Sequence, residues 1–130
     1  MNEFPKGWFY IHCPSRFDQV LTLTSATMQP TQKIELRPKQ HSNRQLWTYN
    51  QGYLINKHTA YVLTVKDSKK TNQYIYPMPK QEGEDQRWKL DENMRLVLMD
   101  QPELGINDLA VPQLVEKPST AWRCENDIIA

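Results

Sequence analysis

The sequence predicts a single all-β domain made of three repeats of about forty residues each. Three observations predict it: a pattern of ten residues that occurs twice, a series of short strand-like runs, and the lack of a long amphipathic helical pattern. The segments PKQHSNRQLW (residues 38–47) and PKQEGEDQRW (residues 79–88) share Pro, Lys, two Gln and Trp, and all matched pairs are 41 residues apart. A constant period in the range of about 20–50 residues is typical of repeat architectures.

Short runs rich in β-branched and aromatic residues follow one another along the chain, with turn residues between them. In QVLTLTS, Val20 and Thr22 alternate with Leu21 and Leu23, which is the period of two expected of a half-buried strand. The other runs are GWFYIH, QKIELRP, QLWTYN, YLINK, AYVLTVK, QYIYPMP and QRWKLDEN. Turns at intervals of about 8–12 residues, and the scattered Pro and Gly, favour a barrel or a sandwich.

A weaker third copy completes the chain. The segment TAWRCE places Trp122 where the third tryptophan belongs, with Thr120 in place of the glutamine. We therefore expect one domain over residues 1–130, with repeats at approximately 7–50, 51–92 and 93–128 that are anchored by Trp47, Trp88 and Trp122. One hairpin pair cannot bury its apolar face alone, whereas three copies can close a barrel around a shared core.

The composition excludes several classes of function. The formal net charge is +1, so the chain lacks the basic excess of a nucleic-acid-binding surface. No apolar run approaches the roughly 18 residues that a membrane-spanning helix needs, so we expect no membrane insertion. The N-terminal MNEFPKGWFY lacks the apolar segment of a signal peptide, which predicts a cytoplasmic protein if Met1 is the native start.

Neither the histidines nor the cysteines predict a metal or cofactor site. His12, His41 and His58 have no metal-ligand spacing, and we expect them at the surface. Cys13 and Cys124 lie near opposite ends of the chain. They could meet where a closed fold brings its ends together, or they could remain two separate buried thiols.

Gln-x-Trp, repeated about every forty residues among short strands, resembles the ricin B-type lectin family. The match consists of QLW, QRW and a degenerate TAW, and it extends over essentially the whole chain. The resemblance implies a β-trefoil of three pseudo-symmetric repeats. It also implies binding of carbohydrates, often galactose-type sugars, in shallow pockets with at most one in each repeat, and glycans or glycoproteins as partners.

The family's sugar pocket uses an aspartate on one strand, an aromatic ring on the next strand and an asparagine just before Gln-x-Trp. The carboxylate accepts hydrogen bonds from two hydroxyls, and the ring covers the apolar face of the sugar. This sequence departs from that pattern, so the resemblance implies a non-standard or reduced site. The matching positions, which are the sugar-binding candidates, are Thr22, Arg37, Arg44 and Gln45 in the first repeat and Thr64, Met78, Asp85 and Gln86 in the second, while Gly105 takes the aspartate position in the third.

Two groups of residues could replace what the pocket has lost. One group comprises carboxylates in turns, which could instead cap their own turns: Asp18, Asp67, Asp100 and Asp108. The other comprises tyrosines that could stack on a sugar or belong to the core: Tyr49, Tyr53, Tyr61, Tyr74 and Tyr76.

Two other functions stay open. The domain could have lost sugar binding and could bind a protein partner through its loops. The stretch EDQRW also carries Glu84, Arg87 and Trp88 in a pattern similar to the active-site stretch of ribosome-inactivating N-glycosidases, where Glu and Arg assist the loss of adenine from ribosomal RNA. Because the repeat already accounts for Trp88, we expect a non-catalytic lectin module rather than an enzyme.

Overall fold

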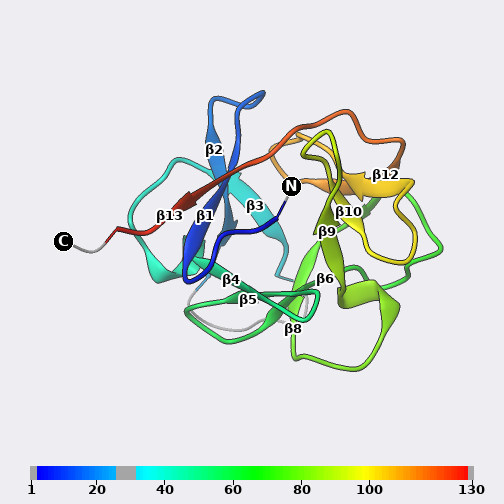
Figure 1. The fold of residues 1–130 in the computed structure, drawn as a ribbon, viewed down its shortest axis with the longest axis horizontal. Coiled ribbons are helices and arrows are strands. Elements are labelled where there is room, and N and C mark those ends of the chain that lie inside the picture. The colour runs from blue at the N-terminus through cyan, green and yellow to red at the C-terminus, as the bar shows by residue number, and fades with distance from the viewer. Residues whose placement is uncertain (1–2, 26–31, 129–130) are drawn as a thin grey trace.

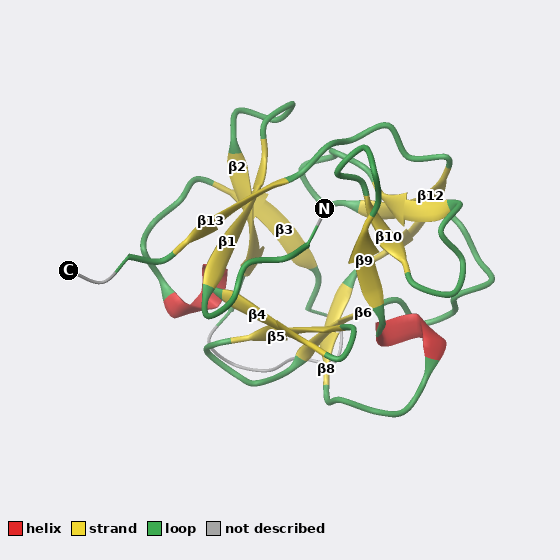
Figure 2. Cartoon of the chain, in the orientation of Figure 1, coloured by secondary structure: helices red, strands yellow, loops and turns green. Residues whose placement is uncertain are grey.

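The computed structural model describes residues 3–25 and 32–128, which form thirteen strands and two single-turn 3-10 helices (Figures 1 and 2). The elements fall into three successive groups. The first group contains β1 (Phe9–Cys13), β2 (Gln19–Leu23), β3 (Ile34–Arg37), η1 (Asn43–Gln45) and β4 (Trp47–Asn50). The second contains β5 (Tyr53–Asn56), β6 (Val62–Thr64), β7 (Gln73–Tyr74), β8 (Tyr76–Met78), η2 (Glu84–Gln86) and β9 (Trp88–Leu90). The third contains β10 (Leu96–Leu98), β11 (Leu104–Ile106), β12 (Gln113–Glu116) and β13 (Arg123–Asn126).

The same antiparallel pairing recurs in each group. Strand β2 pairs with β1 and β3, β6 pairs with β5 and β8, and β11 pairs with β10 and β12. The last strand of each group then pairs with the first strand of the next, as β4 does with β5 and β9 with β10. Strand β13 pairs with β1, so the third group closes on the first, and the two strands lie side by side in Figure 1.

Contacts between the first and last strands of each group complete a six-stranded barrel. Phe9 of β1 pairs with Trp47 of β4. In the other two groups, the backbone N–H of Trp88 donates to the carbonyl of Gly52 at 2.8 Å, and that of Trp122 donates to the carbonyl of Met94 at 2.9 Å. The barrel consists of β1, β4, β5, β9, β10 and β13, and the β2–β3, β6–β8 and β11–β12 hairpins extend from it. This arrangement is a β-trefoil, which confirms the predicted fold of three pseudo-symmetric repeats.

The three repeat tryptophans all lie in the shared core. Trp47 and Trp88 are 0% exposed and Trp122 is 2% exposed. The indole N–H of Trp47 donates to the carbonyl of Leu21 at 3.1 Å, and that of Trp88 donates to the carbonyl of Leu63 at 2.9 Å. The indole nitrogen of Trp122 is buried and has no hydrogen-bond partner among the described residues. The tryptophan of the third repeat therefore packs in the core as the other two do, but it lacks their indole hydrogen bond among the described residues.

The glutamine before the first tryptophan holds three polar groups with one amide. The side-chain nitrogen of Gln45 donates to the carbonyl of Pro38 at 2.8 Å and to the hydroxyl of Thr22 at 3.2 Å. Its side-chain oxygen accepts from the backbone N–H of Gln40 at 2.7 Å. We call this set of bonds the glutamine clamp, because it ties β2 to the loop that leads into β4.

The second repeat contains the same clamp. The nitrogen of Gln86 donates to the carbonyl of Pro79 at 2.9 Å and to the hydroxyl of Thr64 at 3.2 Å, and its oxygen accepts from the N–H of Gln81 at 2.6 Å. Gln45 and Gln86 are 0% and 2% exposed. Buried amides that are fully hydrogen-bonded in this way stabilise a fold, so both glutamines have a structural role.

The two cysteines are free thiols on neighbouring strands at the seam where β13 meets β1. Cys124 lies opposite Ile11, two residues before Cys13 in β1. Burial raises the pKa of the Cys124 thiol to about 12, and burial also raises the pKa of Cys13. The closed fold therefore brings the two thiols to adjacent strands as separate, protonated side chains.

We expect Gln86→Ala to lower the free energy of unfolding by about 2–4 kcal/mol, because it removes three hydrogen bonds and leaves buried polar groups without partners. Gln81→Ala is the matched control, since Gln81 is exposed and contributes only backbone groups to the clamp. Urea unfolding followed by tryptophan fluorescence measures both variants. Equal stabilities of the two variants would contradict the structural role of the amide.

Candidate functional site

A pocket of about 120 Å³ lies on the β2–β3 hairpin and the loop that follows it. Four of the predicted candidates, all from the first repeat, line this pocket: Thr22, Arg37, Arg44 and Gln45. Strand β2 supplies Thr22, strand β3 ends at Arg37, and η1 supplies the other two residues. The fold thus brings the positions that the sequence mapped onto a sugar site into one hollow.

The hydrogen-bonding groups on the floor of the pocket are already paired within the protein. Thr22 is 7% exposed, and its hydroxyl donates to the carbonyl of Val20 at 2.9 Å. The same oxygen accepts from the amide of Gln45 at 3.2 Å. A hydroxyl has a single proton to donate, so Thr22 offers a ligand no donor and one remaining lone pair.

The rim of the pocket carries its charge. The backbone N–H of Arg44 donates to the hydroxyl of Ser42 at 3.2 Å, and its guanidinium donates to the carbonyl of Thr24 at 3.3 Å. Arg37 is exposed and donates twice to one carboxylate oxygen of Glu35, from Nε at 3.2 Å and from Nη2 at 2.8 Å. The rim therefore presents two guanidinium groups, of which only that of Arg37 is paired with a carboxylate in the described part of the chain.

Five further residues line the pocket that the sequence did not single out: Leu23, Thr24, Pro38, Gln40 and Ser42. A signal for two of them was present, because Pro38 and Gln40 belong to the repeated PKQ triplet. The clamp explains that triplet, since the carbonyl of Pro38 and the N–H of Gln40 both bond to Gln45.

The candidates of the second repeat have the same scaffold and different rim groups. The hydroxyl of Thr64 donates to the carbonyl of Val62 at 2.9 Å and accepts from Gln86, as in the first repeat. Met78 and Asp85, both partly buried, occupy the places of Arg37 and Arg44. The second repeat therefore has one negative charge where the first has two positive charges.

The third repeat has no room for a side chain at the aspartate position. A β-carbon on Gly105 would lie 2.6 Å from the carbonyl oxygen of Leu96, 2.6 Å from the ring of Pro118 and 2.9 Å from Val97. Such contacts require the backbone to shift, so neither an aspartate nor a threonine fits there without repacking.

The turn carboxylates and the tyrosines lie outside the pocket. Asp18 and Asp108 bond to their neighbours instead, since Asp18 pairs with Arg123 at 2.8 Å and Asp108 accepts from the hydroxyl of Ser15 at 2.9 Å. Asp67 accepts from the backbone of Lys69 at 3.0 Å, as a turn-capping carboxylate does. The tyrosines lie at separate places. The ammonium groups of Lys33, Lys66 and Lys80 lie over the rings of Tyr74, Tyr76 and Tyr53, respectively. Tyr49 packs against the core.

The E-x-x-R-aromatic stretch is built into the second repeat. Trp88 is buried, and a guanidinium nitrogen of Arg87 lies 3.5 Å from the hydroxyl of Tyr53. The side chain of Glu84 lies outside the described part of the structure. The N-glycosidase interpretation stays a prediction that no observation on this stretch favours.

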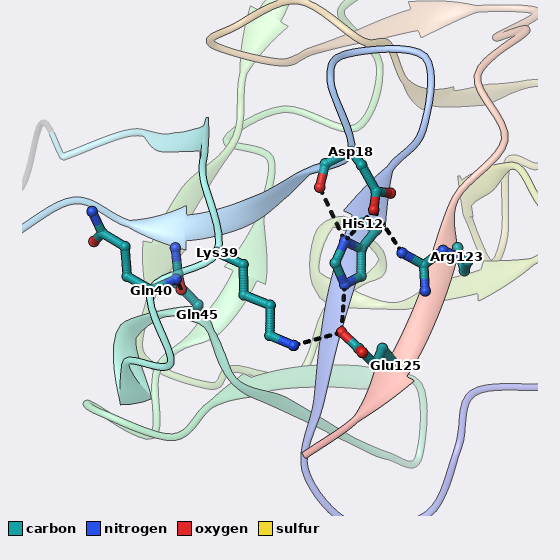
Figure 3. Close-up of polar contacts among 7 residues, drawn as sticks. All are labelled: His12, Asp18, Lys39, Gln40, Gln45, Arg123 and Glu125. Carbon is teal, nitrogen blue, oxygen red and sulfur yellow. Dashed lines mark hydrogen bonds and ion pairs between the residues drawn. The ribbon is translucent and has the colours of Figure 1, made fainter. Parts of the chain in front are cut away.

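A cluster of charged residues joins the pocket loop to the two ends of the chain (Figure 3). His12 lies at its centre, with Nδ1 3.0 Å from the carbonyl of Asp18 and Nε2 2.8 Å from the carboxylate of Glu125. The ammonium of Lys39 lies 2.9 Å from the same carboxylate oxygen of Glu125. Lys39 directly precedes Gln40, so this ion pair holds the edge of the pocket against β13.

The cluster corrects the expectation that His12 is a surface residue, because His12 is only 4% exposed. Strand β13, which carries Arg123 and Glu125, pairs with β1 and covers His12. No local pattern in the sequence predicts this contact, since His12 and Glu125 are 113 residues apart. In the described part of the chain, no three His, Cys, Asp or Glu side chains are grouped so that they could hold a metal ion.

The hydrogen bond and ion pair with Lys39, together with the hydrogen bond from His12, lower the pKa of Glu125 to about 2. The carboxylate is therefore ionised at any pH near neutrality. Its ionised form is stabilised by the fold, which makes this contact sensitive to acid.

A larger, open hollow of about 800 Å³ lies around the β9–β10 turn. Four carboxylates line it: Glu3, Asp91, Glu92 and Glu103. Burial opposes ionisation of Asp91, but hydrogen bonds from Arg95 and Asn93 outweigh it and lower the pKa of Asp91. Asp91 is therefore engaged in its own turn, and the hollow does not bring together any of the candidate residues.

Comparisons with solved structures support the fold, whereas comparisons of the sequence do not find a match. No model of a known protein family matches the chain, and no curated protein sequence is significantly similar to it. The C-half of an earthworm R-type lectin, solved in complex with GalNAc, superposes with a TM-score of 0.69 at 17% identity, over 95% of this chain and 100% of the lectin. The agglutinin of Abrus precatorius gives a TM-score of 0.77 at 16% identity, over 98% of this chain and 51% of the agglutinin.

A designed protein with threefold symmetry, ThreeFoil, gives a TM-score of 0.75 at 14% identity, over 93% of this chain and 99% of the design. These likenesses confirm the predicted resemblance in fold to ricin B-type lectins. Among the described residues, the structure contains no helix long and apolar enough to cross a membrane.

We expect the contact of Glu125 to stabilise the protein fully above about pH 4.5 and to be lost progressively as the pH falls toward about 2, since the pKa of Glu125 is lowered from 4.5 to about 2 on folding. Glu125→Gln should lower the free energy of unfolding at pH 7 by about 0.5–1 kcal/mol, because the pair is partly exposed. It should also flatten the loss of stability between pH 4.5 and pH 2.

Urea unfolding at a series of pH values measures both effects. Glu116→Gln, which changes an exposed carboxylate at the end of β12, is the matched control. If the two variants lost stability in parallel as the pH falls, the assigned role of Glu125 would be wrong.

Proposed function

We propose that this domain is a non-catalytic carbohydrate-binding module whose working site is the pocket of the first repeat. The observation that carries this proposal is the convergence of Thr22, Arg37, Arg44 and Gln45 on one hollow. These residues were mapped onto a sugar site from the sequence alone, and they come from β2, the end of β3 and η1. The earthworm and Abrus lectins of the same fold support the proposal.

The size of the pocket limits the ligand. A hollow of about 120 Å³ lies below the range of about 300–1,000 Å³ that is usual for sites that enclose drug-sized molecules. It fits part of one sugar unit at the end or edge of a glycan. Most of the contacting groups are polar side chains on the rim, which suits a ligand rich in hydroxyl groups.

The site differs chemically from the galactose pocket that the family resemblance implies. Arg37 stands where an aromatic ring would cover the sugar face, and Thr22 stands where a carboxylate would accept two hydroxyl protons. Because neither of these interactions is available, we infer that galactose itself binds weakly. The specificity then depends on the guanidinium groups and on Gln40 and Ser42.

A glycan array followed by titration with NMR detection tests the proposal on isotope-labelled protein. Amide signals of residues 22–24 and 37–45 should shift on binding, while those of residues 64–66 and 78–86 serve as an internal control. The titration extends to about 10 mM, where a ligand with a dissociation constant of about 1 mM is nearly saturating. Absence of binding by every glycan would overturn the proposal, and shifts confined to the second repeat would move the site.

A second candidate function, protein binding, is favoured by one observation at the tip of the β1–β2 hairpin. Phe17 is 87% exposed and has a φ of 53°, next to Asp18 with a φ of 55°. A bulky residue in the left-handed region is an outlier that needs support from its surroundings. Ser15 supplies that support through its bond to Asp108, as does Arg16, whose guanidinium donates to the carbonyl of Asp108.

We expect Phe17→Ser to abolish the binding of such a protein partner without lowering stability. Affinity capture from a host lysate, with and without excess glycan, measures it. A protein captured in the presence of glycan by the unmodified domain, and not by the variant, would support this function. Loss of every captured protein on addition of glycan would exclude it.

A further inference from the structure

We propose that the pocket of the first repeat binds an anionic saccharide, one that carries a carboxylate or a sulfate ester. This inference rests on the proposed carbohydrate-binding function and names the class of sugar. It follows from the charge of the lining, from the state of each hydrogen-bonding group, and from a comparison with the second repeat.

The lining of the pocket has only one sign of charge. Arg37 and Arg44 are its two charged residues, and no carboxylate lines it. A sugar site built for neutral hydroxyl groups gains from a carboxylate, because a carboxylate can only accept hydrogen bonds and sugar hydroxyls donate them. This pocket has the opposite character, since guanidinium groups can only donate.

Arg44 is the residue best placed to meet an anion. The guanidinium of Arg44 donates to the neutral carbonyl of Thr24, and this bond uses one of the five guanidinium N–H groups. No carboxylate lies within ion-pair distance of it among the described residues. Its position is therefore fixed while its charge is not neutralised, and the partly buried setting screens that charge less than bulk water would.

Arg37 has a secondary role in binding the anion. It is 53% exposed at its side chain, and Glu35 already pairs with it at 2.8 Å. Exposed pairs of this kind contribute little and exchange readily. Arg37 can therefore turn toward a ligand from the opposite side of the pocket, but it does so in competition with Glu35.

The floor of the pocket cannot compensate for the missing acceptors. The hydroxyl proton of Thr22 is used by Val20, and its oxygen already accepts from Gln45. Both side-chain groups of Gln45 are occupied in the clamp. A ligand that brings its own acceptor oxygens, as a carboxylate or sulfate does, matches this excess of donors, and a planar guanidinium can hold such a group by two hydrogen bonds.

The second repeat shows that the fold does not require these arginines. It has the same clamp through Gln86 and Thr64, with the bond between them at 3.2 Å as in the first repeat. Asp85 stands there in the place of Arg44. Since the identical scaffold forms around a residue of opposite charge, the positive rim of the first repeat is a property of its pocket rather than of the clamp.

The test compares galactose, galacturonic acid and galactose 6-sulfate, which differ only at C6, by calorimetry or NMR titration. We expect at least one of the two acidic sugars to bind about tenfold or more tightly than galactose, the effect of one charge-assisted contact. Comparison of the two acids distinguishes a carboxylate from a sulfate ester. The preference should decrease between low and high salt, which tests the inference without any substitution.

Arg44→Gln should abolish the preference for the acidic sugar over galactose. Lys69→Gln, which removes one positive charge from an exposed loop of the second repeat, is the matched control and should leave the preference intact. Arg44→Asp introduces the residue that the second repeat tolerates, and it should repel the acid. Circular dichroism and thermal unfolding establish that each variant is folded.

The outcomes separate this inference from the function on which it rests. If galactose binds as tightly as both acids, or if Arg44→Gln keeps the preference, the inference is wrong and the carbohydrate-binding function stands. If none of these sugars and no glycan on the array binds, the function itself fails. If acetate or inorganic sulfate competes as well as the acidic sugar binds, the site recognises a simple anion and the saccharide assignment is overturned.

Discussion

Most of this structure depends on the hydrogen bonds of two side-chain amides, that of Gln45 in the first repeat and that of Gln86 in the second. The Gln45 side chain fixes the strand that carries Thr22, the carbonyl of Pro38 directly after β3 and the backbone of the loop that follows. The tryptophan two residues later can then enter the core at a fixed depth and donate to the hairpin carbonyl. Where the glutamine is missing, in the third repeat, the indole of Trp122 has no partner among the described residues.

The clamp also shapes the candidate site, because its members form the pocket floor. A buried amide and a hydroxyl that satisfy each other leave the interior of the hollow electrically neutral. The chemical character of the pocket is then set by the residues around it, which do not take part in the clamp. The two repeats illustrate this separation, since they share the clamp and differ in the charge at Arg44 and Asp85.

Much of the fold could be predicted from the sequence, because its information is local and repeated. The period of 41 residues, the Gln-x-Trp triplets and the alternation in β2 were sufficient for a closed barrel of three copies. The four positions of the first-repeat pocket could also be placed, since each has a fixed distance from its own Gln-x-Trp. The resemblance did not show that the glutamine and threonine would bond to each other, which removes Thr22 as a donor to a ligand.

Other features depend on contacts between distant parts of the chain and had no signal in one sequence. The burial of His12 follows from its neighbours on β13, and the contact between Lys39 and Glu125 joins residues 86 positions apart. The residues Thr24 and Ser42 enter the pocket through loop geometry rather than through a repeated pattern. Periodicity predicts which face of a strand is apolar, but the polar face can still be covered by another strand.

The pairing of β13 with β1 has a consequence for biosynthesis. Along one edge of β1, the four residues from Phe9 to His12 pair with the residues from Arg123 to Asn126. A ribosome makes β1 first, so this strand has an open edge until the last strand emerges from the exit tunnel. Barrel closure is therefore a late event that spans most of the polypeptide, and the nascent chain depends on its hairpins, or on chaperones, to protect that edge in the meantime.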